Sequence, residues 1–475
     1  MSLAAPSQEP EPERTRTRRR RLAIVGIVTV VIAAAHVWYG NRHHFFDLLV
    51  YRDAMRWWDA GNPLYAFIQP DDTQGRLGFT YPPFAAYLLR PLAWMTPAQT
   101  VWAYSVIAVA AFAASIWWLV RPLAPASGAS ATKQDRGPAW FVFALAFVAS
   151  TTLEPIREAF TFGQINVVLW ALILLDLLVL LPRGSRFTGV GIGLATAIKL
   201  VPGIFILYLL VTRRWIAAGV ATATTALATG IGIGLATAIK LVPGIFILYL
   251  LVTRRWRAAA VAVGTALGAT ALAAAAAPGD SWTFFTSRLP RGEGVGRLEY
   301  AFNQSILGTL ARLAYPGQPS RVLWIGLAVV IIWYGMWRAA KLAKAGDEVA
   351  AIAVVGIVGS LASPVTWVHH LFWFVPALVV LVDAARRSTV ALAAVVYLTV
   401  TVSVVALWEF SLGAPGGPVG FALSNWYVWL MLALLVLLPA RAARDAVAKD
   451  GGEREPAELA RRRVASDGDQ VAEPT

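Results

Sequence analysis

Asp47 is the carboxylate best placed for chemistry, because it follows directly after the first apolar run of the chain and lies among aromatic and aliphatic residues. A carboxylate beside lipid is costly in its charged form, which suits it to accept a proton. The alternative is an interfacial helix on which Asp47 only faces water. Residues 48–60 place apolar and aromatic side chains near helical spacing, with Arg52 and other charges interleaved, which is typical of a helix lying in the membrane interface.

His369 and His370 form a second candidate group, at a point where one apolar run ends and the next begins. A histidine pair there can bind a metal, respond to pH, or donate hydrogen bonds to an anionic or sugar ligand. Adjacent side chains on a helix point about 100° apart, so they rarely bind one metal together. We therefore favour hydrogen bonding to a ligand, with Trp367 beside the pair, or a structural role for one of the two histidines.

Further polar and aromatic residues are candidates for binding a sugar. Asn303 and Gln304 carry amides near Trp and Tyr, a combination found in pockets for sugar hydroxyls. Tyr81 precedes Pro82-Pro83 and gives either an aromatic contact for a ligand or simply the start of a helix. Asp71-Asp72 matches a metal–diphosphate motif, but such pairs are more typical of solvated turns.

Composition predicts an all-α, polytopic membrane protein. Of the 475 residues, 58% are hydrophobic and 14% charged, and several apolar runs reach the length of about 20 residues that crosses a bilayer. With no Cys and five His, we expect neither a disulfide nor a metal centre. The net charge of +14 does not indicate nucleic-acid binding, because the basic residues cluster at the ends of apolar runs. Abundant Ala and Arg are typical of a GC-rich bacterial genome.

Charge also predicts the organisation of the chain. We expect a disordered cytoplasmic N-terminus (1–21), a multi-span domain (22–440) and a disordered cytoplasmic tail (441–475). Placing the basic clusters inside puts the loop 41–81 outside, and it places 154–164, 280–310 and 365–373 on the same external face. The run 82–94 is too short for a comfortable span and is expected to be re-entrant or interfacial.

An exact repeat is the most unusual feature of the sequence. Residues 191–215 recur without change as residues 232–256, which indicates a recent duplication and not a solenoid. Each copy holds a lysine before Leu-Val-Pro-Gly, which are Lys199 and Lys240. We expect each copy to form a hairpin that breaks at this point, within the segment 188–256. Such a hairpin adds an even number of crossings, so the orientation downstream is kept.

An ordered set of motifs resembles glycosyltransferase family 87, the polyprenol-phosphate-mannose-dependent α-mannosyltransferases of GT-C membrane fold. The resemblance covers about residues 22–440, although family members resemble a chain with one copy of the hairpin, so either lysine could belong to the site. The motifs are Asp47 with Val50-Tyr51, Thr80-Tyr81-Pro82-Pro83-Phe84, Gly163-Gln164-Ile165-Asn166, Ala197-Ile198-Lys199-Leu200-Val201-Pro202, Asn303-Gln304-Ser305, and Ser363-Pro364 to His369-His370.

The resemblance implies that Asp47 is a general base for mannosyl transfer from polyprenyl-phosphate mannose, with inversion. The acceptor would be a glycolipid such as phosphatidylinositol mannoside or lipomannan, reached from the external face of the bacterial plasma membrane. The cations expected to stabilise the leaving phosphate are Lys199 or Lys240, with Arg52 as a further candidate. We expect no metal or other cofactor, and we assign the remaining contacts with donor or acceptor to Tyr51, Tyr81, Gln164, Asn303, Gln304, Trp367, His369 and His370.

A polytopic transporter or a flippase for lipid-linked sugars is the alternative. Broken helices with an intramembrane lysine and an internal repeat also occur in transporters. However, transporter repeats are ancient halves of the protein, whereas this repeat is short and unaltered. The predicted ionisable residues also gather at the external edge of the membrane and not at its midplane. These two features favour the transferase.

Overall fold

The computed structural model describes residues 11–71, 75–123, 138–199, 243–289, 297–411 and 417–441, and this part of the chain is almost entirely helical. Its two strands, β1 (Gln69–Asp71) and β2 (Gly75–Leu77), form one antiparallel pair. The predicted all-α class is therefore confirmed. The helices of the first half are α1 (Glu11–Tyr39), α2 (Phe46–Asp59), α3 (Pro83–Leu89), α4 (Pro97–Val120), α6 (Ala139–Thr151), α7 (Glu154–Phe162), α8 (Asn166–Leu174) and α9 (Val190–Ile198).

The second half continues after the repeat with helices of similar character. They are α13 (Ile245–Val252), α14 (Trp256–Ala276), α15 (Pro278–Thr283), α17 (Ile306–Ala314), α18 (Arg321–Lys344), α19 (Glu348–Ala362), α20 (Phe374–Ala384), α21 (Arg387–Thr401), α22 (Val404–Ser411), α23 (Gly417–Ser424) and α24 (Trp426–Leu437). Short helical turns are η1 (Leu64–Ala66), η2 (Arg90–Trp94), η3 (Arg121–Leu123), η4 (Leu175–Leu180), η5 (Phe284–Arg288) and η6 (Val368–His370).

Four helices in the described part are long and apolar enough to cross a bilayer, which makes the protein a multi-pass membrane protein. They are Thr15–Tyr39, Pro97–Leu123, Trp256–Ala276 and Arg321–Lys344. Two pairs of consecutive helices meet the same criterion if each pair is counted as one bent span. They are α6–α7, bent by 71°, and α23–α24, bent by 63°. The run 82–94 forms α3 and η2, both too short to cross, as predicted.

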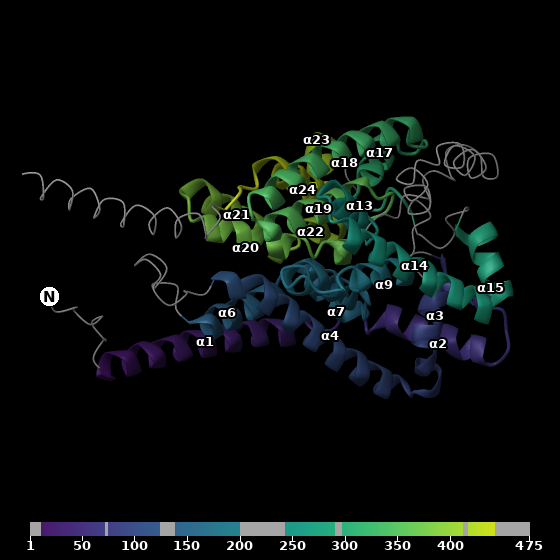
Figure 1. Cartoon of the computed structure of the whole chain (residues 1–475), viewed down its shortest axis with the longest axis horizontal. Coiled ribbons are helices and arrows are strands. Elements are labelled where there is room, and N and C mark those ends of the chain that lie inside the picture. Colours follow the sequence, from purple (N-terminus) through teal and green to yellow (C-terminus); the bar gives the residue numbers. More distant parts are fainter. Residues whose placement is uncertain are drawn as a thin grey trace, which may run out of the picture.

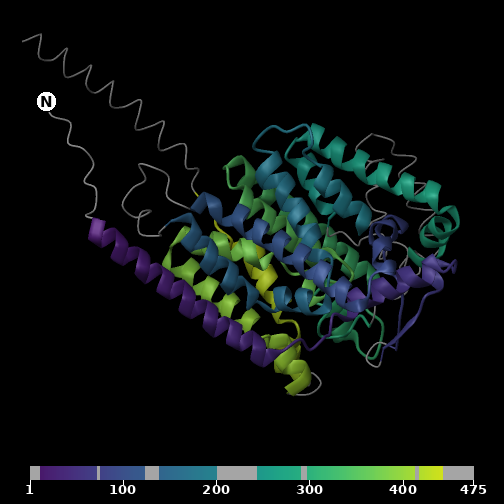
Figure 2. The ribbon, with the colours of Figure 1, turned by 90° about the horizontal axis from the view of Figure 1, so that it is seen from below.

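The helices pack in two layers. In Figure 1, α1, α4, α6 and α7 lie in the lower layer and α17 to α24 in the upper one. Helix α1 packs along α6 and runs down one edge of the molecule, as Figure 2 shows from below. Helix α19 is the centre of the upper layer, because every residue from Val349 to Ala362 is buried. At the right of Figure 1, α2, α3 and α15 gather at one end.

The two copies of the repeat together provide one helical hairpin. Helix α9 belongs to the first copy and ends at Lys199, whereas Pro243, Gly244 and α13 belong to the second. Both helices pack against α14. Residues 200–242, with Lys240 among them, lie outside the described part, so the break predicted within each copy stays a prediction.

Glycines and an ion pair hold this hairpin in place. A Cβ on Gly189 would lie 2.2 Å from the Ala258 carbonyl oxygen, and one on Gly193 would lie 2.5 Å from that of Ala262, so only glycine allows α9 to approach α14 this closely. At the other end, Arg255 pairs with Glu348 at the start of α19 through two contacts of 2.6 Å. The hairpin is therefore anchored to both neighbouring helices.

Gly163 is the second position where the fold demands glycine. It ends α7 with φ +75°, and a Cβ there would lie 2.4 Å from the Cβ of Leu48 on α2. Left-handed backbone costs other residues about 1–2 kcal/mol. This close approach of α7 to α2 brings the residue after Gly163 beside the start of α2.

Deleting residues 200–240 is expected to leave a folded protein. The deletion joins Lys199 to Leu241 and restores the Lys-Leu-Val-Pro-Gly sequence of a single copy, and it removes none of the residues that form α9 or α13. Size-exclusion profile and apparent melting temperature in detergent should match those of the parent chain. Deleting residues 245–285, a segment of equal length that includes α13 and α14, is the control that should abolish folding. Aggregation of the first variant would contradict the hybrid hairpin.

Gly163→Ala is expected to lower the apparent melting temperature more than Gly61→Ala. Both positions have positive φ (+75° and +87°), but no heavy atom lies within 4 Å of a Cβ on Gly61, whereas a Cβ on Gly163 would meet Leu48. The control therefore carries the backbone cost without the steric one. Thermal unfolding of the two variants in the same detergent measures the difference. Equal melting temperatures would show that the approach of α7 to α2 is not tight.

Candidate active site

Asp47 lies in the first turn of α2, which follows a short turn after α1. In this turn Asn41 accepts the backbone N–H groups of His43 and His44 at 3.2 and 2.9 Å, a typical Asx turn. The backbone N–H of Phe45 then donates to the Thr161 carbonyl on α7 at 2.8 Å. Asp47 is thereby fixed against α7, and the side-chain amide of Gln164, the residue after Gly163, donates to its carboxylate.

Gln164 is held in one orientation by its neighbours. Its side-chain oxygen accepts from the Tyr51 hydroxyl at 3.4 Å and from the Asn166 amide at 3.2 Å. The Tyr104 hydroxyl donates to its backbone carbonyl at 3.2 Å. Because two donors occupy the oxygen, the amide nitrogen is the atom that faces Asp47. The carboxylate thus receives a directed hydrogen bond.

Tyr51 and Tyr81 stack edge to face above this pair, with their hydroxyls 3.0 Å apart. Burial, followed by the nearby Tyr81 and Asp47, raises the pKa of Tyr51 well above its ordinary value. Burial is also the main cause that raises the pKa of Tyr81, while the hydrogen bond with Tyr51 lowers it and Asp47 raises it further. Both phenols therefore stay protonated and act as hydrogen-bond donors beside the carboxylate.

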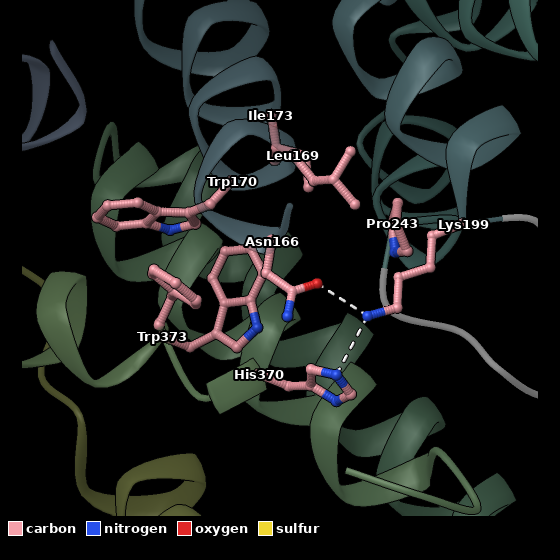
Figure 3. Close-up of a pocket in the computed structure, with 9 residues that line it drawn as sticks. Asn166, Leu169, Trp170, Ile173, Lys199, Pro243, His370 and Trp373 are labelled. Carbon is pink, nitrogen blue, oxygen red and sulfur yellow. Dashed lines mark hydrogen bonds between the residues drawn. The ribbon is translucent and has the colours of Figure 1, made fainter. Parts of the chain in front are cut away.

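Lys199 lies on the other side of Asn166. Its ammonium donates to the Asn166 side-chain oxygen at 2.8 Å and lies 3.1 Å from Nε2 of His370, as Figure 3 shows. It also lies 5.9 Å from the centre of the Tyr81 ring. The amides of Gln164 and Asn166 thus join the carboxylate to the cation in one continuous hydrogen-bonded chain.

The tautomer of His370 follows from its backbone contact. Nδ1 accepts the backbone N–H of Trp367 at 3.2 Å, so the proton of the neutral ring is on Nε2. Nε2 and the Lys199 ammonium are then both donors, and they face each other at 3.1 Å. Two such donors are satisfied by an oxygen of an anion better than by one another. The pair is therefore suited to bind an oxyanion.

A pocket opens between these polar groups and an apolar wall. It is a small, partly open cavity of about 30 Å³, lined by Asn166, Leu169, Trp170, Ile173, Lys199, Pro243, His370, Phe372 and Trp373. Figure 3 shows Lys199, Asn166 and His370 converging on one side of it and the two tryptophans on the other. One cationic end and one apolar side suit an amphiphilic anion.

His369 and His370 have different environments, as expected for neighbours on a turn. The His369 ring lies 5.5 Å from Phe162, which in turn stacks on His43 at 3.7 Å. Burial is the largest cause that lowers the pKa of His369 well below its ordinary value, followed by the charges of Lys199 and His43. His369 is therefore neutral near pH 7. His43 pairs with Glu158 at 2.6 Å.

The other predicted contact residues lie outside this chain of hydrogen bonds. Arg52 donates to the Met95 carbonyl at 2.8 Å and pairs with Asp53 at 2.6 Å. Asn303 accepts the Thr366 N–H at 3.0 Å, and Trp367 pairs with it in an isolated bridge. The contacts of Asn303 with Thr366 and Trp367 secure the segment that carries His370. The predicted contact of Arg52, Asn303 and Trp367 with substrate stays a prediction.

Gln304 is equally engaged in the fold. Its backbone N–H donates to the Thr366 carbonyl at 2.7 Å, and its side-chain oxygen accepts the backbone N–H of Tyr427 at 3.1 Å. It is fully buried. Its role in the described structure is to connect the loop before η6 to α24, and a role in binding sugar is likewise untested.

Sequence reasoning did not assign Asn166 a role, although it noted the motif that contains it. The signal was available, because an amide two residues after Gln164 begins helix α8 at the edge of an apolar run. It also did not single out Trp170 and Trp373, which are large apolar residues in apolar segments. Their place in the pocket depends on how α8 and α20 pack.

Among the described residues, no group of three or more His, Asp or Glu side chains is arranged to hold a metal ion. Asp71 ends strand β1, and Asp72 lies outside the described part. The metal–diphosphate reading of this pair is therefore not supported by any described geometry.

Comparison with known proteins identifies relatives over most of the chain. The model of glycosyltransferase family 87 matches residues 79–233 and 227–364, two stretches that overlap beside the start of the second repeat copy. A polyprenol-phosphate-mannose-dependent alpha-(1-2)-phosphatidylinositol mannoside mannosyltransferase of Mycobacterium tuberculosis is 30% identical over 364 residues, which are 75% of this chain and 74% of the relative.

Two proteins of Mycolicibacterium smegmatis are similar over comparable lengths. One is also a polyprenol-phosphate-mannose-dependent alpha-(1-2)-phosphatidylinositol mannoside mannosyltransferase. It is 32% identical over 74% of this chain and 73% of the relative's length. The other is a polyprenol-phosphate-mannose-dependent alpha-(1-2)-phosphatidylinositol pentamannoside mannosyltransferase, 26% identical over 71% of this chain and 69% of its own. No solved structure matches the chain. With a family model that matches more than half of its length and relatives at this identity, the chain belongs to glycosyltransferase family 87.

Proposed function

We propose that this protein transfers a mannosyl residue from polyprenyl-phosphate mannose to a lipid-linked mannoside, with inversion at the anomeric carbon. The observation that carries the proposal is the hydrogen-bonded chain from Asp47 to Lys199. It places a carboxylate that can accept a proton and a cation that can hold a phosphate at opposite ends of one small site. The printed activities of the relatives supply the donor and the acceptor class.

In the proposed step, Asp47 accepts the proton of an acceptor hydroxyl as that oxygen attacks the anomeric carbon of the donor. The bond between this carbon and the phosphate oxygen breaks, and polyprenyl phosphate leaves with the bonding electrons. General-base assistance of this kind contributes about 10²- to 10⁴-fold. The hydrogen bond from Gln164 fixes the direction in which the carboxylate points.

Lys199 and His370 stabilise the departing phosphate in this proposal. Negative charge develops on the phosphate as the bond breaks, and fixed donors in a site of low dielectric constant are well suited to stabilise it. Both donors lie on the wall of the pocket. Neutral His369 and the protonated Tyr51 and Tyr81 are further donors around the sugar. The proposed step uses no metal.

The proposed site is at the external surface of the plasma membrane, with both termini inside. The basic clusters of the sequence support this orientation through the positive-inside rule. Exposed tryptophans support a position of the site at the membrane interface. They lie on elements at the end of the molecule near α2 and are Trp57 on α2, Trp94 on η2 and Trp282 on α15. Such residues prefer the membrane interface, where a lipid carrier presents its sugar.

Asp47→Asn is expected to lower the rate of mannosyl transfer by about 100-fold or more, because the amide cannot accept the proton. Binding of the donor should persist, since the cationic end of the site is unchanged. Transfer of label from radiolabelled polyprenyl-phosphate mannose to phosphatidylinositol mannoside by the purified protein measures the effect. Asp59→Asn, on the last turn of the same helix, is the control and should keep full activity. Full activity of Asp47→Asn would exclude the general base.

Lys199→Met and Lys240→Met form a matched pair, because the two lysines stand in identical sequence contexts. Lys199 contacts Asn166 and His370, so its loss should raise KM for the donor and lower kcat, each about tenfold or more. Lys240→Met should behave like the parent chain in the same transfer assay. The reverse pattern would assign the phosphate contact to the second copy.

A further inference from the structure

Trp373 is a pocket residue that none of the assigned roles explains. It lies just before α20 and is 3% exposed. Among the described residues, its indole N–H has no hydrogen-bond partner. A buried donor without a partner is destabilising, and native proteins keep few of them. Such a group at the wall of a ligand pocket suggests that a ligand supplies the acceptor.

The ring of Trp373 is held rigidly, so its N–H has a fixed direction. A Cβ on Gly356 of α19 would lie 1.8 Å from the indole, which shows that the ring lies directly against the glycine backbone. Phe246 of α13 lies 5.1 Å away, between ring centres. In Figure 3 the indole nitrogen is on the edge of the ring that faces Asn166 and Lys199.

Nearly every polar group at this end of the pocket is a donor. Lys199 carries an ammonium, and His370 in its neutral form carries its proton on Nε2, whereas the Asn166 amide nitrogen already donates to Gln164 and to the His369 carbonyl. The Asn166 side-chain oxygen is occupied by Lys199. An indole N–H added to this set selects for a group with several acceptor oxygens and a negative charge, which describes a phosphate.

The remaining wall is apolar and fits a hydrocarbon chain next to that phosphate. Leu169, Ile173, Phe372 and Pro243 line it, together with Trp170. A free phosphate or a sugar alone would leave this surface in contact with water, at a cost proportional to its area. A phosphate that carries an isoprenoid covers it.

We propose that the indole N–H of Trp373 donates a hydrogen bond to a phosphate oxygen of the polyprenyl donor, and that the apolar wall covers its first isoprene units. This inference rests on the proposed function and adds a specificity-determining residue to it. It assigns the pocket to the donor and not to the phosphate of the acceptor lipid. The hydrogen bond persists to the leaving polyprenyl phosphate, so it can be measured on that product.

Farnesyl phosphate is the probe, since it carries the phosphate and the first isoprene units of the product. Calorimetric titration of the full-length protein in detergent should show Trp373→Phe binding it at least about tenfold more weakly, because a hydrogen bond to a charged group is lost. Farnesol, which lacks the phosphate, should bind both proteins alike. Trp324→Phe is the matched control, because Trp324 is fully buried on α18 with an unpartnered N–H and does not line the pocket.

Replacing Trp373 with benzothienylalanine gives a second variant that keeps the shape of the ring and replaces only the N–H by sulfur. It should reproduce the loss of affinity, and it preserves the test if Trp373→Phe does not fold. Unchanged affinity for farnesyl phosphate in the folded variants overturns the proposal. An equal loss for farnesol overturns it as well, because the indole would then act through packing alone.

Two further probes separate the possible sources of phosphate. Inorganic phosphate should bind far more weakly than farnesyl phosphate, and phosphatidylinositol should be unaffected by the loss of the N–H. A loss confined to phosphatidylinositol would assign the pocket to the acceptor and contradict the proposal. Mannosyl transfer by the parent chain is measured in parallel. If transfer occurs while Trp373→Phe binds farnesyl phosphate normally, only this inference fails; if no transfer occurs, the proposed function itself fails.

Discussion

The hydrogen bonds from Asp47 through Gln164 and Asn166 to Lys199 are the feature on which the site depends. A carboxylate and an ammonium this close would pair directly if nothing separated them. Two amides prevent that, because each accepts on its oxygen and donates from its nitrogen, so the charges remain connected but apart. The amides therefore hold the carboxylate and the ammonium in fixed directions without a direct ion pair between them.

Close backbone packing makes this arrangement possible. Gly163 brings α7 against α2, and glycines of α9 bring Lys199 against the rest of the site by letting α9 approach α14. The histidine segment is fixed separately, by Asn303 and Gln304, whose amides bond its backbone. Polar groups buried in an apolar bundle must be satisfied, and a fully satisfied network also defines one geometry. Structural amides here position the residues that face the ligand.

Because the two copies of the repeat are identical, the sequence does not say which copy forms each helix. Both copies encode the same helix, break and helix, so local propensity cannot prefer one over the other. In the described structure, α9 follows the helices that precede the repeat in the chain, and α13 leads directly into α14. Gly189 lies against Ala258 and so links the flank before the first copy to the flank after the second.

The sequence alone predicted the all-α membrane class, the family and the short run before α4, because apolar run length, charge placement and motif order are local properties. It also named Asp47, Gln164, His370 and either Lys199 or Lys240 as candidate site residues. Only the tertiary structure brought the first three of these residues together with Lys199 and gave Asn166 its bridging position. It also separated Asn303 and Gln304 from the pocket and placed Trp373 in it. Which face of a buried helix meets a cavity depends on the packing of distant segments, and no spacing along the chain encodes that.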